Sequence, residues 1–197
     1  VEHHGRLVAT PVLHTVHYAP AEDEVAIWRR YPDAPFVAVS AAQAARLTGL
    51  RVVGTVHHAV DTDALPFQAT PGDYLLFLGR FTAGKGVLEA IDVARRVGMP
   101  LHLAAEANDY YREAVAPLVD GTSVVYAGEV SGAAKAALLG GARALLYPVQ
   151  KPEPFGLVLA EALACGTPVA ALDMGAVGEI VDHDVTGGIF PTLDALA

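Results

Sequence analysis

The feature that most constrains the fold of this chain is an alternation, from residue 73 onward, between short apolar runs and segments with a helical pattern. Residues 74–78 have the composition of a buried strand, residues 79–86 form a glycine-punctuated loop, and residues 87–97 have the periodicity of an amphipathic helix. The same order recurs, with strands expected over 100–105, 123–127, 144–147, 169–172 and 187–190, and helices over 110–118, 133–139, 157–165 and 177–181. Strands that are apolar throughout and alternate with helices predict an α/β fold whose parallel sheet is covered by helices on both faces.

Residues 1–66 show a shorter version of the same pattern. Apolar runs over 11–17, 35–40 and 52–61 predict strands, and a helix is expected over 41–47 with Ser40 as its cap. The proline-rich stretch that follows, up to residue 72, has no periodicity and is typical of a linker. We therefore divide the chain into a first, incomplete domain with its linker, residues 1–66, and a second domain, residues 67–197.

Composition excludes several classes of protein. The chain has 197 residues, 53% of them hydrophobic, which is enough to bury a sizeable core. Its formal net charge of -9 argues against general binding to nucleic acids or anionic membranes, because both favour a basic surface. The single cysteine, Cys165, falls at the end of an apolar helix and cannot form a disulfide framework.

The sequence contains no sign of a membrane protein. No apolar run approaches the length that a transmembrane helix needs, and residues 1–7 do not have the pattern of a signal peptide. We therefore expect a cytoplasmic protein without a membrane span. The chain does not begin with methionine, which suggests that it is part of a longer protein.

Two carboxylates stand eight residues apart around the start of one predicted helix. Glu153 lies between two prolines, which hold the backbone extended, and Glu161 lies about a turn and a half into the helix. The free N–H groups of residues Phe155, Gly156 and Leu157 at the helix start can bind anions or polar oxygens. Two anionic acceptors suit the hydroxyl groups of a ligand. A single carboxylate of this kind is more simply explained as a solvated surface residue.

A second candidate site is the loop after the strand over 74–78. Gly79-Arg80 and Lys85-Gly86 place two cations between the end of a strand and the start of a helix. This arrangement suits a phosphate, because glycines permit close approach of the backbone and the cations supply charge. It is not a P-loop, since Gly86 stands where that motif needs a hydroxyl. In isolation, Arg80 and Lys85 are equally well explained as ordinary surface cations.

The histidines do not predict a metal site. His17 ends the first predicted strand, and the carboxyl ends of strands are where open α/β sheets bind ligands, so His17 is a candidate site residue. His14, His102 and His183 have no acidic or cysteine partner at the spacing of a metal site. His57 and His58 are adjacent at a strand end, so we expect their side chains to point in opposite directions.

The two motifs together resemble a known family. The segment from Glu153, Glu-Pro-Phe-Gly-Leu, with Glu161 and the Ala-Cys-Gly-Thr-Pro-Val ending, is similar to the Glu-x7-Glu signature of retaining GT-B glycosyltransferases of the GT4-like group. Gly-Arg-x4-Lys-Gly is similar to the diphosphate-binding element of that family. The resemblance implies a Rossmann-like donor domain with helices on both faces of a parallel sheet, preceded by the end of a second, partial Rossmann-like domain. His58-Ala59 replaces the Asn-Gly of the family at the passage between domains.

The resemblance also implies roles for individual residues. Arg80 and Lys85, after Gly79, would hold the donor diphosphate, Glu161 would accept hydrogen bonds from the ribose, and Glu153 from the donor sugar. His17 would approach the sugar from the other domain. The backbone around Gly128 would hold the nucleobase, and the N–H groups of Phe155, Gly156 and Leu157 would orient sugar and phosphate. Glu153, His17, Arg80 and Lys85 are the expected catalytic residues.

The expected activity is transfer of a hexosyl or related sugar from a nucleoside-diphosphate sugar to a carbohydrate, lipid or small-molecule acceptor. The resemblance implies retention of configuration, and Arg80 and Lys85 supply the positive charge that a metal supplies in other transferases, so we expect no metal and no cofactor. Two alternatives stay open. One is a non-catalytic nucleotide-sugar-binding module that needs a partner chain. The other is a GT-B-type phosphorylase or epimerase.

Overall fold

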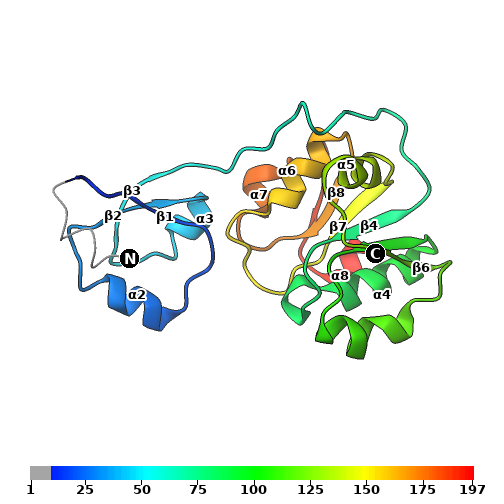
Figure 1. The fold of residues 1–197 in the computed structure, drawn as a ribbon, viewed down its shortest axis with the longest axis horizontal. Coiled ribbons are helices and arrows are strands. Elements are labelled where there is room, and N and C mark those ends of the chain that lie inside the picture. Colours follow the sequence, from blue (N-terminus) through cyan, green and yellow to red (C-terminus); the bar gives the residue numbers. More distant parts are fainter. Residues whose placement is uncertain (1–9) are drawn as a thin grey trace.

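The computed structural model describes residues 10–197, and these residues form two parallel sheets joined by an extended linker (Figure 1). The first sheet has the order β1-β2-β3, from β1 (His14–Val16), β2 (Pro35–Ala38) and β3 (Arg51–Thr55). Two helices accompany it, α2 (Glu22–Trp28) and α3 (Ala41–Ala44). The expectation about residues 1–7 falls outside the described residues.

The second sheet contains the alternation that the sequence predicts. Its six strands have the order β6-β5-β4-β7-β8-β9, and all of its pairings are parallel. The strands are β4 (Leu75–Leu78), β5 (Leu101–Ala104), β6 (Val124–Gly128), β7 (Ala144–Tyr147), β8 (Val169–Leu172) and β9 (Gly187–Phe190). The α-helices are α4 (Val87–Val97), α5 (Gly132–Gly140), α6 (Leu157–Ala164), α7 (Val177–Ile180) and α8 (Leu193–Leu196).

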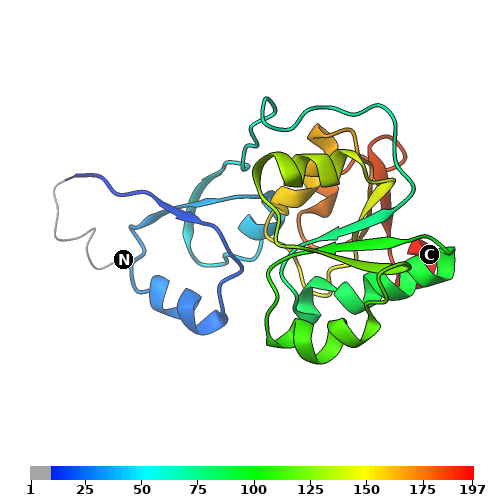
Figure 2. The same cartoon turned by 45° about the vertical axis from the view of Figure 1, so that its right-hand side comes forward.

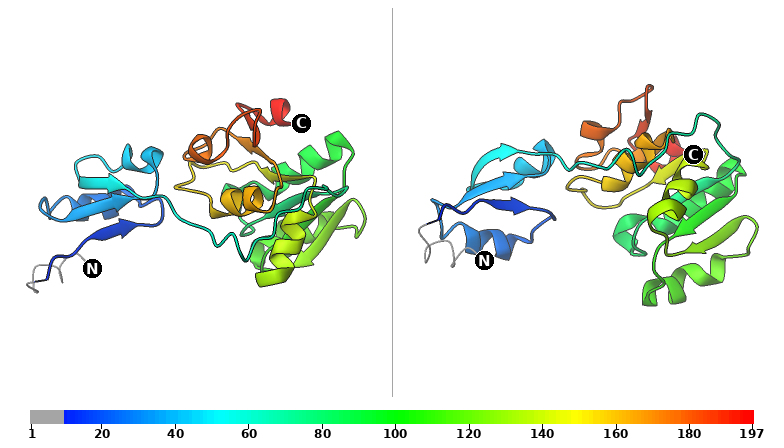
Figure 3. Two further views of the ribbon diagram at one scale, coloured as in Figure 1. Left: turned by 90° about the horizontal axis from the view of Figure 1, so that it is seen from above. Right: turned by 45° about the horizontal axis from the view of Figure 1, so that its top comes forward.

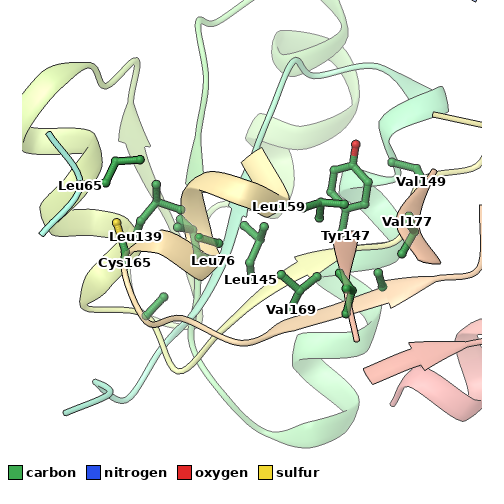
Figure 4. Close-up of a cluster of buried hydrophobic side chains, with 14 of the residues drawn as sticks. Leu65, Leu76, Leu139, Leu145, Tyr147, Val149, Leu159, Cys165, Val169 and Val177 are labelled. Carbon is green, nitrogen blue, oxygen red and sulfur yellow. The ribbon is translucent and has the colours of Figure 1, made fainter. Parts of the chain in front are cut away.

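Helices cover both faces of the second sheet, as predicted. Leu76 of β4 points into a core cluster with Leu139 of α5 and Leu159 of α6, shown in Figure 4. Its neighbours Leu75 and Phe77 point the other way, into a second cluster with residues of α4 and α8. This alternation along one strand is the pattern of a sheet buried on both sides. Figures 1 and 3 show α5 and α6 on one side of the sheet and α4 and α8 on the other.

The first sheet has a core of its own. Val16, Phe36 and Ala38 from its strands pack with Val25 and Trp28 from α2. The sequence analysis did not identify α2, although Val25 and Trp28 lie three residues apart on one helical face and three acidic residues occupy its first turn. This helix is short, and its buried face consists of only these two side chains.

Two predicted helices differ in kind or in length. The segment expected to be a helix over 110–118 is a π-helix over Tyr111–Val115 followed by a 3-10 helix over Ala116–Leu118. Pro117 lies in the 3-10 helix and has no N–H with which to continue α-helical hydrogen bonding. The helix expected over 41–47 ends at Ala44. Beyond that residue the chain makes tighter bonds three residues apart, from Leu47 N to Ala44 O.

The order of the second sheet brings two loops together. After β4 the chain continues to β5 and β6 on one side, and after β7 it continues to β8 and β9 on the other, so β4 and β7 are neighbours at a switch point. Gly86 has a φ of 77°, and a Cβ there would lie 1.9 Å from the carbonyl oxygen of Pro148. Gln150 N donates to Gly84 O at 3.0 Å. The basic loop and the loop that leads to Glu153 therefore lie in direct contact.

The linker is attached to the second sheet's helices. Leu65 is buried in the cluster of Figure 4. Gln68 N donates to Cys165 O at 2.9 Å, and Gly72 N donates to Gly141 O at 3.1 Å. Figure 2 shows this cyan and teal segment passing along the side of the sheet that carries α5 and α6. None of the helices among residues 10–197 is both long and apolar enough to cross a membrane.

Candidate functional site

The centre of the site is an ion pair between the two loops at the switch point. Lys85 Nζ lies 2.5 Å from Glu153 Oε2. Their side chains are 27% and 17% exposed, so both charges are largely shielded from water by protein. From the sequence we expected these residues to have separate partners, a phosphate and a sugar, and not to bind each other. The pair has no net charge, and it links the basic loop to the loop that carries Glu153.

The backbone of Glu153 is fixed from the other side. Ala176 N donates to Glu153 O at 3.0 Å, and Glu153 forms a parallel bridge with Gly175. Gly175 has a φ of 65°, and a Cβ there would lie 2.3 Å from Glu153 O. Only glycine permits this approach. Glu153 lies in a loop, as predicted, but this loop is held in place by the turn that precedes α7.

The four residues expected to be catalytic lie around one hollow between the two sheets. It has a volume of about 260 Å³, and its lining includes His17, Arg80, Lys85 and Glu153. The lining also contains the remaining predicted residues of the two loops, Gly79, Phe155, Gly156 and Leu157. A second hollow of about 430 Å³ shares His17, Arg80, Lys85 and Glu153 with the first. The structure therefore brings eight of the ten predicted site residues to one place.

Arg80 differs from Lys85 in its surroundings. It is exposed, and it forms no ion pair with another residue in the described part of the chain. Arginine presents a planar fork of donors and keeps its charge, so an exposed arginine beside a hollow is free to bind an anion. Among the described residues that line this hollow, Arg80 has no ion-pair partner, whereas Glu153 neutralises Lys85.

The other two predicted residues lie elsewhere. Glu161 and Gly128 do not line the hollows around Glu153. Gly128 ends β6 with a φ of 80°, as the last residue before the turn to α5. Glu161 Oε1 accepts a hydrogen bond from Lys135 Nζ at 2.7 Å, which links α6 to α5. Lys135 was not predicted from the sequence, because its helix has a weak amphipathic pattern and no residue spacing connects it with Glu161.

A group of aromatic rings forms the wall between the two sheets. His17 stacks on His58 with 5.2 Å between ring centroids, and His58 meets the ring of Phe155 edge-on at 5.0 Å. The His57 ring lies 5.5 Å from the same phenylalanine. The expectation that His57 and His58 point in opposite directions is therefore wrong. Both residues lie beyond the end of β3, where the alternation of a strand no longer applies.

Tyr147 is a further site residue that the sequence analysis did not identify. It ends β7 and lines the hollow beside Glu153. Burial, together with the adjacent Glu153 carboxylate, raises the pKa of Tyr147 far above its ordinary value. Its hydroxyl is therefore a neutral group that can donate a hydrogen bond at any physiological pH. The signal that could have identified it is its position at the carboxyl end of a central strand.

Metal ligands do not cluster in the described part of the chain. Within residues 10–197, no group of three or more histidine, cysteine, aspartate or glutamate side chains could hold a metal ion. The acidic side chains of the site have cationic partners instead, Lys85 for Glu153 and Lys135 for Glu161.

The contact of His17 with His58 predicts a dependence of stability on pH. Burial lowers the pKa of His58 below its usual value of 6.5, and His17 contributes in the same direction. The unfolded chain therefore takes up this proton first, and stability is lost as the pH falls below 6.5. We expect the urea midpoint to fall more steeply between pH 7.5 and pH 5.5 in the native chain than in His58→Gln. Equal slopes would contradict this assignment.

Comparison with known proteins is consistent with this geometry. A family model described as glycosyl transferases group 1 matches residues 67–197. The chain therefore belongs to the glycosyl transferases group 1 family. Over 150 residues it is 31% identical to glycogen synthase from Mycobacterium tuberculosis, a match that covers 71% of this chain and 36% of that protein. The chain thus spans about a third of the length of this relative.

Solved structures with the same fold are GT-B glycosyltransferases. Sucrose-phosphate synthase from Thermosynechococcus elongatus has a TM-score of 0.85 and 22% identity, and the match covers 98% of this chain and 58% of that chain. HepE from Anabaena, in complex with UDP and glucose, has a TM-score of 0.82 and 19% identity, covering 100% of this chain and 62% of that chain. The fold is therefore the GT-B fold, with its parallel sheets and flanking helices.

Proposed function

We propose that the protein to which this chain belongs transfers a sugar from a nucleoside-diphosphate sugar to an acceptor, and that this chain carries the donor site. The observation that carries the proposal is the meeting of the two motifs around one hollow, with Arg80, Lys85, Glu153 and His17 in its lining. The sites of α/β sheets lie at the carboxyl ends of their strands, at switch points of this kind.

Arg80 and Lys85 are the groups that hold the donor diphosphate. Negative charge grows on the leaving phosphate oxygen as the bond to the sugar breaks, and fixed cations stabilise it most when they are already in place. Lys85 is held by Glu153, and its loop is held by the contact of Gly86 with Pro148. In this proposal Arg80 binds as a fork and Lys85 as a point charge.

Glu153 and His17 act on the donor sugar. Glu153 accepts hydrogen bonds from the sugar hydroxyls with the carboxylate oxygen that Lys85 leaves available, and the neutral Tyr147 hydroxyl beside it supplies a donor. His17 comes from the first sheet and reaches the sugar from the opposite wall, so the complete site needs both sheets in contact. Glu161 binds the ribose, Gly128 lies where the nucleobase binds, and the acceptor is a carbohydrate, lipid or small molecule.

Transfer proceeds with retention of configuration and without a metal or cofactor in this proposal. The positive charge around the diphosphate comes from Arg80, Lys85 and the start of α6, which together take the place of a divalent cation. Glu153 and Glu161 are both committed to hydroxyl groups, which leaves no carboxylate to activate an acceptor for inversion. Retention of configuration is otherwise inferred from the resemblance of the Glu-x7-Glu segment to the signature of retaining GT-B glycosyltransferases.

The full-length enzyme tests these features together. With a donor of known anomer and after treatment with a chelator, we expect turnover to continue and the product to keep the anomeric configuration of the donor. This chain alone should bind a uridine nucleotide, the ligand found in HepE, with a rise in thermal midpoint. It should transfer nothing, because it spans about a third of its relative. An inverted product, or turnover restored only by added divalent metal, would overturn the mechanism.

A further inference from the structure

The chain has two units: the first sheet with α2 and α3, and the second sheet with its helices. Glu179 of α7 connects these two units through a single carboxylate. Its Oε2 atom accepts a hydrogen bond from Ala41 N at 2.8 Å, and its Oε1 atom accepts one from Ala42 N at 2.8 Å. His57 Nε2 lies 3.2 Å from Oε2. These three partners belong to α3 and to the start of the linker, 122 to 138 residues away in sequence. Neither motif of the sequence analysis includes Glu179.

Two of the partners of Glu179 are backbone N–H groups that have no other acceptor among the described residues 10–197. Ser40 already caps α3 by accepting a hydrogen bond from Gln43 N at 2.9 Å. The N–H groups of Ala41 and Ala42 are therefore the free donors of that turn, and a carboxylate from another unit binds both. Burial opposes the ionisation of Glu179, but the bonds from Ala42, Ala41 and His57 outweigh it and hold its pKa below the usual value.

The same element also holds the loop of Glu153. Gly175 and Ala176, whose backbone pairs with Glu153, immediately precede α7, so Glu179 lies three residues beyond the Ala176 N–H that bonds Glu153 O. A hollow of about 300 Å³ separates α3 from this turn, with Gln43 on one wall and Glu153 and Gly175 on the other. One short segment thus contacts the first sheet with its side chain and the Glu153 loop with its backbone.

We propose that Glu179 is a positioning residue that latches the two units together and sets the place of His17 relative to Glu153. His57, which Glu179 contacts, is adjacent to His58, on which His17 stacks. Contacts of the Glu179 segment therefore lead to His17 on one wall of the hollow and to Glu153 on the other. Glu179 itself does not line this hollow. Its effect on transfer rests on the proposed function, whereas its effect on the contact between the units does not.

The distance between the units is the direct measurement. Spin labels at Ile27→Cys on α2 and Val97→Cys on α4 use two exposed positions, one in each unit, and the native Cys165 is buried. We expect the distance distribution from pulsed electron resonance to broaden or shift in Glu179→Ala and, to a smaller extent, in Glu179→Gln. Glu22→Ala is the matched control, because it removes a carboxylate whose partner, Arg29 at 2.6 Å, lies in the same unit, and it should leave the distribution unchanged.

Donor binding and turnover separate positioning from loss of folding. Arg80, Lys85 and Glu161 all belong to the second unit, so UDP affinity in Glu179→Ala should stay within about twofold of the native value, because substitutions at separated sites act independently. In the full-length enzyme we expect kcat to fall roughly tenfold with the donor KM unchanged, since misplacement of a reacting group costs rate. Glu179→Gln, which keeps one carbonyl acceptor, should recover part of this loss.

An unchanged distance distribution in Glu179→Ala would overturn the latch. So would a distribution altered equally by Glu22→Ala, or a loss of UDP affinity as large as the loss of kcat, since either would make Glu179 a general folding residue. If neither variant nor native chain binds UDP while the distances still change in Glu179→Ala, the proposed function fails and the latch stands.

Discussion

Replacing Arg80 and Lys85 together by alanine is expected to weaken the binding of a nucleoside diphosphate by at least about 100-fold. A hydrogen bond that involves a charged group contributes roughly 1.5–3 kcal/mol, so the loss of two such cations costs about 3 kcal/mol or more. Each 1.4 kcal/mol corresponds to a tenfold change in affinity. The parent nucleoside, which has no phosphate, should lose less than about threefold on the same scale.

The surroundings of Lys85 make the effect on the diphosphate larger. Lys85 Nζ is 2.5 Å from the Glu153 carboxylate, whose side chain is 17% exposed. Its removal leaves that negative charge uncompensated beside the hollow, where it repels the phosphates. Calorimetric titration of UDP and of uridine, with the native chain and with the double variant, measures both effects.

A control variant tests whether the loss of any two positive charges from the chain lowers the affinity for UDP. Arg95→Ala with Arg96→Ala removes the same two positive charges from the last turn of α4, at the end opposite to the basic loop. We expect this variant to bind UDP nearly as well as the native chain does. If both double variants lose the same affinity, or if uridine and UDP are weakened equally by the loss of Arg80 and Lys85, the assignment of the diphosphate is wrong.

Glu161→Ala is expected to lower the affinity for a ribonucleotide by about one to two decades. The expectation rests on the same magnitude for a hydrogen bond to a charged group, roughly 1.5–3 kcal/mol. Glu161 is 19% exposed, so water replaces its bonds to the ligand poorly. A 2',3'-dideoxynucleotide lacks the two hydroxyls that Glu161 would bind, and its affinity should change by less than about threefold.

Lys135 supplies the matched control for this prediction. Glu161→Ala also breaks the 2.7 Å ion pair with Lys135, so a loss of affinity could come from the disruption of α5 and α6 alone. Lys135→Met breaks the same pair and leaves the carboxylate in place. We expect Lys135→Met to retain most of the ribonucleotide affinity. Equal losses in Glu161→Ala and Lys135→Met would instead make the ion pair a structural contact between two helices.

Most strands and helices around the second sheet could be predicted from the sequence, because the local hydrophobic pattern there matches the burial of the residues in the fold. The predicted strand over 144–147 and the predicted helix over 87–97 have the observed bounds. The two loops were also identified, since glycines and prolines interrupt the pattern at the places where loops are needed. Their joint role came only from the family resemblance, and their meeting at the switch point is seen in the strand order of the structure.

The parts that could not be predicted depend on contacts between distant segments. The ion pair of Lys135 with Glu161 joins two helices whose relative rotation no periodicity specifies. Glu179 looks like an ordinary acidic residue of a short helix until the first sheet is placed beside it. The π-helix over Tyr111–Val115 has an α-helical pattern in sequence, and that pattern does not distinguish the two kinds of helix.

The attachment of the linker to the second unit keeps the first sheet close to the proposed donor site. Leu65, Gln68 and Gly72 are fixed to the second unit, and His57 and His58 at the start of the linker also contact Phe155. The linker is therefore short and attached at both of its ends. A short tether keeps the effective concentration of its two ends high, and lengthening it lowers that concentration only slowly. The contact between His17 and the second unit is therefore intramolecular, and its effective concentration does not depend on protein concentration.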